Sequence, residues 1–257
     1  MIDRCDNKQF YVVANWKLNQ PIDCIDKWLY DFNSLFENIN NINVVICPSF
    51  ISLESLFKKY NSVNVNIGAQ NLSNKLKGSF TGEVSAFDLS TIGVKYVILG
   101  HSERRIYYGE TDALIIEKIQ MSLQNNITPI VCLGEQTNSI NEEFVIDQID
   151  YYLSNIDNKY INNIIFTYEP LFSIGQKTII NTDYLNKMID LIRERIHSHI
   201  GDSTENVIIQ YGGSITNSNI IDLISNSRVN GLLIGRSSID VYEFIDILKL
   251  ICNYNIN

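Results

Sequence analysis

Side chains suited to acid–base chemistry follow short apolar runs in this sequence. Asn15 and Lys17 come after the first run, His101 after the fourth and Glu169 after the sixth. A lysine supplies a positive charge and an asparagine an amide donor, while histidine and glutamate can exchange protons. Taken singly, Lys17 also fits an exposed lysine, and His101 an ordinary packed or exposed histidine. Their combination at run ends suggests a reaction site.

The neighbouring residues should affect the protonation of two of these groups, His101 and Glu169. A helix that begins at Ser102 or Glu103 would place His101 against its N-terminus, where the partial positive charge of the backbone disfavours an imidazolium. Glu169 ends a buried run and precedes Pro170. Because water has restricted access there, we expect a raised pKa for the Glu169 carboxyl, which would make it a useful base.

Glycine turns follow the seventh and eighth runs, at residues 211–214 (YGGS) and 235–237 (GRS). Glycine lets backbone N–H groups approach a ligand, and the N-terminus of a following helix favours an anion. The apolar loop 171–178, which carries Gly175, is typical of a lid or of a subunit contact. A base, a neutral electrophile, a cation and an anion-binding turn together suit proton abstraction next to a carbonyl on a small phosphorylated substrate.

Eight short apolar, β-branched runs extend along the chain, at residues 10–14, 43–48, 63–69, 94–100, 127–134, 163–169, 206–213 and 230–235. They are nearly continuous in apolar residues, which is typical of parallel strands that are buried on both faces. Helical apolar stripes lie between them, for example over 145–156, 185–200 and 241–252. Ser139 and Glu142 have the spacing of a capping box for the first of these helices.

Eight alternations of strand and helix predict a single α/β domain over residues 1–257, a closed (β/α)8 TIM barrel with eight parallel strands and an outer ring of helices. A doubly wound open sheet is the alternative, although no GxGxxG follows the first run, which counts against its dinucleotide-binding form. In a barrel the C-terminal ends of all strands meet on one face. The fold would therefore bring Asn15, Lys17, His101 and Glu169 together.

The composition excludes several classes of function. A formal net charge of −9 argues against a partner nucleic acid, whose phosphates need a basic face. The five cysteines form no CxxC pair and no cluster with histidine, which predicts reduced thiols and no metal site. No stretch has the length of a signal peptide or a membrane span, so we expect a soluble, cytoplasmic protein.

Six motifs resemble those of the triosephosphate isomerase family, in the same order and at similar spacing across all eight units. They are ANWKLN (14–19), TGE (81–83), YVILGHSERR (96–105), YEPLFSIG (168–175), YGGS (211–214) and GLLIG (231–235). The resemblance implies the interconversion of dihydroxyacetone phosphate and D-glyceraldehyde 3-phosphate through an enediolate, in glycolysis and gluconeogenesis. It implies no cofactor.

The resemblance also assigns roles to residues. Glu169 would be the base, and His101 would polarise the carbonyl and shuttle protons. Lys17 and Asn15 would stabilise the negative charge, with Glu103 oriented toward Lys17.

The resemblance further implies a phosphate site and a partner subunit. The substrate phosphate would be held by backbone N–H groups at Gly175, Ser214, Gly235 and Arg236. A homodimer would form through the loop 70–83, from Gln70 to Glu83, with Thr81 near the Asn15 region of the neighbouring subunit.

The sequence departs from the family pattern at three points. The lid is one residue shorter around Gln176, Phe172 replaces a tryptophan at the first lid hinge, and Arg236 replaces the glycine after Gly235. The shorter lid is the one feature that favours a non-catalytic or low-activity homologue retained for binding. A Schiff-base aldolase on the same barrel would need a lysine within a late strand, and the last three runs contain none.

Overall fold

A computed structural model describes residues 10–19, 22–36, 41–59, 65–137, 139–173 and 180–255. Its strands all run parallel and close into a barrel in which each pairs with the next and the last with the first. They are β1 (Phe10–Asn15), β2 (Ile42–Cys47), β3 (Val65–Ala69), β4 (Tyr96–Leu99), β5 (Thr128–Leu133), β6 (Ile165–Tyr168), β7 (Ile208–Gly212) and β8 (Gly231–Ile234). The pairing of β1 with β8, for instance Tyr11 with Gly231, makes the open-sheet alternative wrong.

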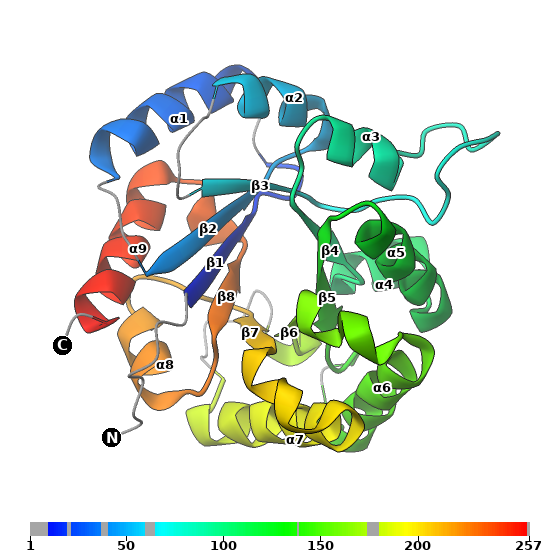
Figure 1. Cartoon of the computed structure of the whole chain (residues 1–257). Coiled ribbons are helices and arrows are strands. Elements are labelled where there is room, and N and C mark those ends of the chain that lie inside the picture. Colours follow the sequence, from blue (N-terminus) through cyan, green and yellow to red (C-terminus); the bar gives the residue numbers. More distant parts are fainter. Residues whose placement is uncertain are drawn as a thin grey trace.

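Helices surround the strands as a ring (Figure 1). The α-helices are α1 (Ile22–Leu35), α2 (Phe50–Lys59), α3 (Ala86–Thr91), α4 (Ser102–Tyr108), α5 (Asp112–Gln124), α6 (Glu142–Asn155), α7 (Thr182–Ile200), α8 (Ile220–Asn226) and α9 (Val241–Asn255). Short 3-10 helices are η1 (Asn158–Asn163), η2 (Leu171–Ser173), η3 (Gly201–Asn206) and η4 (Arg236–Ser238). The predicted (β/α)8 barrel is thus confirmed, and its extent as one domain over the whole chain stays a prediction.

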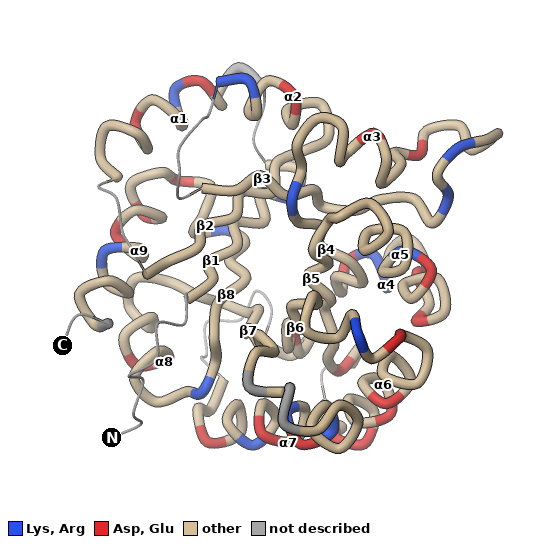
Figure 2. The backbone as a smooth tube through the Cα atoms, viewed as in Figure 1, with Lys and Arg blue, Asp and Glu red and all other residues tan. Residues whose placement is uncertain are grey.

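Both faces of the strands are buried, which explains their continuous apolar sequences. Side chains such as Val13, Ile98 and Ile130 fill the inside of the barrel, and a larger layer packs between strands and helices. The strand sequences contain no charged residue. Charged residues therefore lie mostly on the surrounding helices and loops (Figure 2).

The predicted capping box of α6 is wrong. The helix begins at Glu142, and its N-cap is Asn141, whose Oδ1 accepts a hydrogen bond from the N–H of Phe144 at 3.1 Å. The hydroxyl of Ser139 instead lies 2.9 Å from that of Thr137. Asparagine caps a helix about as well as serine, so Asn141, which directly precedes the helix, is the N-cap in place of Ser139.

The ends of β5 and β6 approach closely at Gly134. Its φ is +154°, and a Cβ atom there would lie 2.6 Å from the carbonyl oxygen of Glu169. Only glycine fits such a contact with backbone, so Gly134 lets β5 pack against the start of the segment that carries Glu169.

The Gly134→Ala variant should lose about 3 kcal/mol or more of unfolding free energy, because strain of the backbone adds to the contact with Glu169. Gly109→Ala is the matched control: its φ is +66° and nothing lies within 4 Å of the added Cβ. The control should lose only about 1 kcal/mol. Urea unfolding measures both, and equal losses would contradict the close approach of the two strand ends.

Candidate active site

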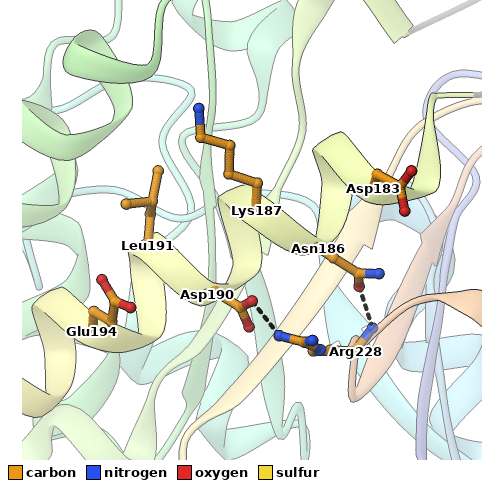
Figure 3. A pocket seen from close by; sticks show the side chains of 7 residues that line it. All are labelled: Asp183, Asn186, Lys187, Asp190, Leu191, Glu194 and Arg228. Atoms are coloured by element: carbon orange, nitrogen blue, oxygen red, sulfur yellow. Dashed lines mark hydrogen bonds and ion pairs between the residues drawn. The ribbon is translucent and has the colours of Figure 1, made fainter.

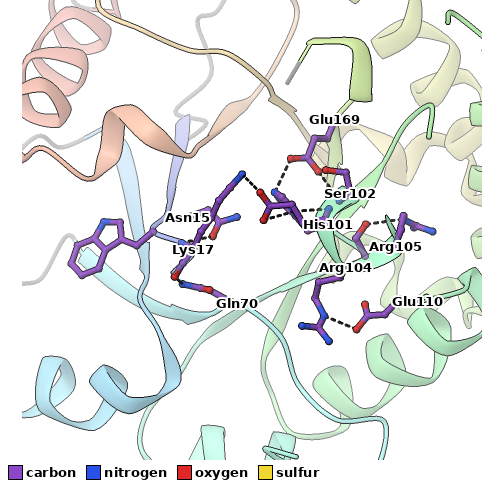
Figure 4. Close-up of polar contacts among 12 residues, drawn as sticks. Asn15, Lys17, Gln70, His101, Ser102, Arg104, Arg105, Glu110 and Glu169 are labelled. Carbon is purple, nitrogen blue, oxygen red and sulfur yellow. Dashed lines mark hydrogen bonds and ion pairs between the residues drawn. The ribbon is translucent and has the colours of Figure 1, made fainter. Parts of the chain in front are cut away.

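The barrel brings the predicted chemical groups to one rim. Asn15 ends β1, Lys17 follows it, His101 follows β4 and Glu169 follows β6. Asn15, His101 and Glu169 are buried, with exposed fractions of 5, 4 and 7 per cent. Figure 4 shows Lys17, His101, Ser102 and Glu169 converging on the same space. The fold therefore assembles these residues from distant parts of the chain.

His101 is the N-cap of α4, which begins at Ser102, one of the two expected starts. Its Nδ1 accepts a hydrogen bond from the N–H of Glu103 at 3.2 Å, so this nitrogen carries no proton. The ring proton is therefore on Nε2, which lies 2.9 Å from Oε1 of Glu169 and donates to it. The arrangement holds a neutral imidazole whose N–H is aimed at the carboxylate.

The carboxylate of Glu169 is held at both oxygens, since Oε2 accepts from the N–H of Ser102 at 3.2 Å. Burial raises the pKa of this carboxyl, whereas the hydrogen bond that His101 donates lowers it. The Ser102 N–H and Lys17 lower it further, and the resulting pKa lies below the ordinary value. The expectation of a raised pKa is wrong for this arrangement, because burial came together with partners that stabilise the anion.

Lys17 is held in an unusual conformation, with φ at +52°. Its Nζ lies 2.6 Å from Oε1 of Glu103, and its N–H donates to Oδ1 of Asn15 at 3.2 Å. The side-chain amide of Gln70 donates to the carbonyl oxygens of Lys17, at 2.9 Å, and of Cys47, at 3.0 Å. Such a backbone costs about 1 to 3 kcal/mol in a non-glycine residue, so these bonds are needed to maintain it.

Sequence reasoning missed several residues of this rim. Gln70 is the first residue after β3, and its position at a strand end was the signal that could have found it. Cys132 lies beside Glu169, and burial first, then the charge of Glu169, raises the pKa of its thiol. The buried guanidinium of Arg105 donates to the carbonyl oxygens of Gly100, at 2.7 Å, and Cys132, at 3.2 Å. It thereby ties the ends of β4 and β5 together.

The residues expected to hold phosphate lie partly within the described chain. A Cβ on Gly235 would come 3.5 Å from Cε of Lys17, so this turn is adjacent to the lysine. The hydroxyl of Ser214 donates to the carbonyl of Ser173 at 2.9 Å, and the exposed Arg236 begins η4.

The lid region is described only in part. Gly175 and Gln176 lie outside the described residues. Phe172 lies in η2, and its ring centre is 6.2 Å from that of Tyr184.

A surface hollow of about 420 Å³ lies elsewhere, along α7 (Figure 3). It is lined by Asp183, Asn186, Lys187, Asp190, Leu191, Glu194 and Arg228. Asp190 and Arg228 form an ion pair in it, and no strand contributes a lining residue. This hollow is therefore separate from the strand-end rim.

In the part of the chain that the structure describes, no cluster of three or more histidine, cysteine or acidic residues could bind a metal ion. None of the helices there has the length and apolar character needed to span a membrane.

The lowered pKa of Glu169 predicts how acid affects stability. Because the folded pKa lies below the ordinary 4.5, the carboxylate stabilises the folded state above about pH 4.5. This contribution disappears as the pH falls through the folded pKa. The unfolding free energy of the wild type relative to Glu169→Gln should therefore decrease between about pH 6 and pH 3 in urea titrations. A relative gain of the wild type on acidification would indicate a raised pKa.

Comparison with known proteins agrees with this geometry. The profile of the family described as triosephosphate isomerase matches residues 10–251. A triosephosphate isomerase of Wigglesworthia glossinidia brevipalpis is 39 per cent identical over 245 residues, 93 per cent of this chain and 95 per cent of the relative. Those of Buchnera aphidicola subsp. Acyrthosiphon pisum and Clostridium tetani are 38 and 34 per cent identical, covering 95 and 93 per cent of this chain and 97 and 95 per cent of their own lengths. The chain belongs to the triosephosphate isomerase family.

Proposed function

We propose that Glu169, His101 and Lys17 are the groups with which this isomerase interconverts dihydroxyacetone phosphate and D-glyceraldehyde 3-phosphate. The observation that carries the assignment is the 2.9 Å contact between Nε2 of His101 and Oε1 of Glu169 at the rim. A base and a neutral hydrogen-bond donor thus lie side by side, and a bound substrate would replace their direct hydrogen bond by its own contacts with both groups.

Glu169 is the base that removes the proton from C1 and returns it to C2. Its two oxygens are occupied in the free enzyme by His101 and the Ser102 N–H. Substrate oxygens compete for the His101 proton, and a bound substrate displaces water from the rim. Both changes raise the pKa of Glu169, so its basicity increases when the substrate is present.

His101 and Lys17 stabilise the charge that develops on the substrate oxygens. The Nε2–H of His101 donates to the carbonyl and then to the enediolate, while Lys17, with the Asn15 amide, supplies positive potential. The ion pair with Glu103 fixes the ammonium in the rim. A carboxylate base beside a neutral imidazole is the arrangement for which this family is the standard example.

The phosphate of the substrate binds at the turns after β6, β7 and β8. The backbone N–H groups of Ser214, Gly235 and Arg236 are the donors, and the closeness of Gly235 to Lys17 supports this placement. The exposed guanidinium of Arg236 adds positive charge.

Neither the relatives nor the geometry of Lys17, His101 and Glu169 favours the non-catalytic alternative.

The proposal includes a homodimer in the cytoplasm. The segment between β3 and α3 projects away from the helix ring in Figure 1. It exposes Leu76 and Phe80 by 42 and 45 per cent, next to the exposed Thr81. Apolar side chains on a projecting loop favour contact with a second subunit. The four described cysteines are free thiols, as expected in a reducing compartment.

Replacing the base tests the catalytic assignment. Glu169→Gln keeps the shape of the side chain but cannot accept the proton, so kcat should fall about 1,000-fold or more in a coupled assay with dihydroxyacetone phosphate. Glu135→Gln is the control: Glu135 is also buried and follows β5, but it is bound by the hydroxyls of Tyr168 and Tyr184. It should keep kcat within about tenfold. Wild-type turnover no faster than that of Glu169→Gln would contradict the assignment of Glu169 as the catalytic base.

A charge on the projecting loop tests the dimer. Leu76→Asp buries an unpaired carboxylate in the proposed contact and should raise the dissociation constant of the dimer about 100-fold or more. Ile140→Asp is the matched control, since Ile140 is 59 per cent exposed but lies near the start of α6. Sedimentation velocity distinguishes the two, and an unchanged dimer of Leu76→Asp would contradict the proposed interface.

A further inference from the structure

Trp16 lies between two residues of the proposed site and faces a different part of the molecule. It is fully buried, and its neighbours in sequence are Asn15 and Lys17. Its indole N–H donates to the carbonyl oxygen of Ser238 at 3.1 Å. Trp16 thus links the end of β1 to η4, the short helix that follows β8, across 222 positions of the sequence.

The Ser238 end of this bond belongs to a firmly connected turn. The N–H of Ser238 donates to the carbonyl of Gly235 at 3.0 Å, and its hydroxyl donates to the same oxygen at 2.7 Å. The neighbouring Ser237 hydroxyl donates to the carbonyl of Ile215 at 2.9 Å, which joins the turn after β8 to the turn after β7. A displacement of Ser238 would therefore also displace the turn that contains Gly235.

The turn that contains Gly235 is adjacent to Lys17, so a shift of the turn changes the distance between them. A Cβ on Gly235 would lie 3.5 Å from Cε and 3.9 Å from Nζ of Lys17. Lys17 belongs to the β1 segment and Gly235 to the β8 segment, so a bond between these segments fixes their separation.

The aromatic cluster around Trp16 allows the effect of ring packing to be distinguished from the effect of the indole hydrogen bond. The Trp28 ring centre lies 4.9 Å from that of Trp16, and Trp28 in turn stacks on Phe32. Trp28 is also buried, but within the described chain its indole nitrogen has no hydrogen-bond partner. The cluster therefore packs a tryptophan ring without requiring that its N–H be bonded.

We propose that Trp16 is a positioning residue that sets the turn of Gly235 and Arg236 for the phosphate group of the substrate, through its bond to Ser238. The inference rests on the proposed function, since it takes these backbone N–H groups as the phosphate donors. It assigns Trp16 no contact with the reacting carbons.

The test compares Trp16→Phe with Trp28→Phe. Both variants keep an aromatic ring in the cluster, but only the first removes an indole N–H that donates a hydrogen bond. For Trp16→Phe, KM for D-glyceraldehyde 3-phosphate and the inhibition constant of inorganic phosphate should both rise about tenfold, the effect of one buried hydrogen bond. Its kcat/KM for D-glyceraldehyde, which lacks the phosphate, should stay within about twofold of the wild type.

Trp28→Phe should leave all these constants within about twofold of the wild type. Equal changes in the two variants, or an equal loss by Trp16→Phe on both substrates, would reduce Trp16 to a packing residue and overturn the proposal. A wild type that turns over neither substrate would instead contradict the proposed function.

If Trp16→Phe does not fold, a second variant tests the same hydrogen bond. The chain has 2 tryptophans, so in Trp28→Phe residue 16 is the sole remaining tryptophan. Biosynthetic replacement of tryptophan by β-(3-benzothienyl)alanine then exchanges the N–H of residue 16 for sulfur at nearly constant shape. The same tenfold rise in KM and in the phosphate inhibition constant supports the proposal, and unchanged constants overturn it.

Discussion

The hydrogen bond from the N–H of Glu103 to Nδ1 of His101 orients the rest of the site. It places the ring proton on Nε2, opposite Glu169. The same first turn of α4 supplies the Ser102 N–H to the carboxylate and the Glu103 side chain to Lys17. One helix N-terminus therefore fixes the tautomer of the electrophile, the position of the base and the location of the cation.

Local groups overcome the charge of the whole molecule. The chain carries a formal net charge of −9, which would repel an anionic substrate at long range. At the rim, however, the hydrogen bond from His101, the Ser102 N–H and Lys17 outweigh burial and lower the pKa of Glu169. The same groups are suited to an enediolate and a phosphate, because short-range hydrogen bonds act where the distant charges are screened.

The strand ends must be held in place for this arrangement to exist. Lys17 has a backbone conformation that is unfavourable outside glycine, and the amide of Gln70 bonds to its carbonyl oxygen. Arg105 joins the ends of β4 and β5. Gly134 allows the end of β5 to approach the backbone of Glu169. Residues with no role in the chemistry thus determine the spacing of those that have one.

The continuous apolar runs and the helical stripes between them were sufficient to predict the barrel, because a strand buried on both faces leaves a distinctive pattern. The order of the strands then placed Lys17, His101 and Glu169 on one face. The motif around His101 predicted a helix that begins at Ser102 or Glu103, and the helix begins at Ser102.

The sequence by itself therefore determined the fold and the family, and it predicted that Lys17, His101 and Glu169 lie at one rim of the barrel. Tertiary structure alone decided the direction of the Glu169 pKa shift, since its sign depends on which donors meet the carboxylate inside the barrel. It likewise decided the contact of Gln70 with the Lys17 carbonyl and the bond from Trp16 to Ser238. These interactions join segments that are remote in sequence, so no local pattern of residues encodes their geometry.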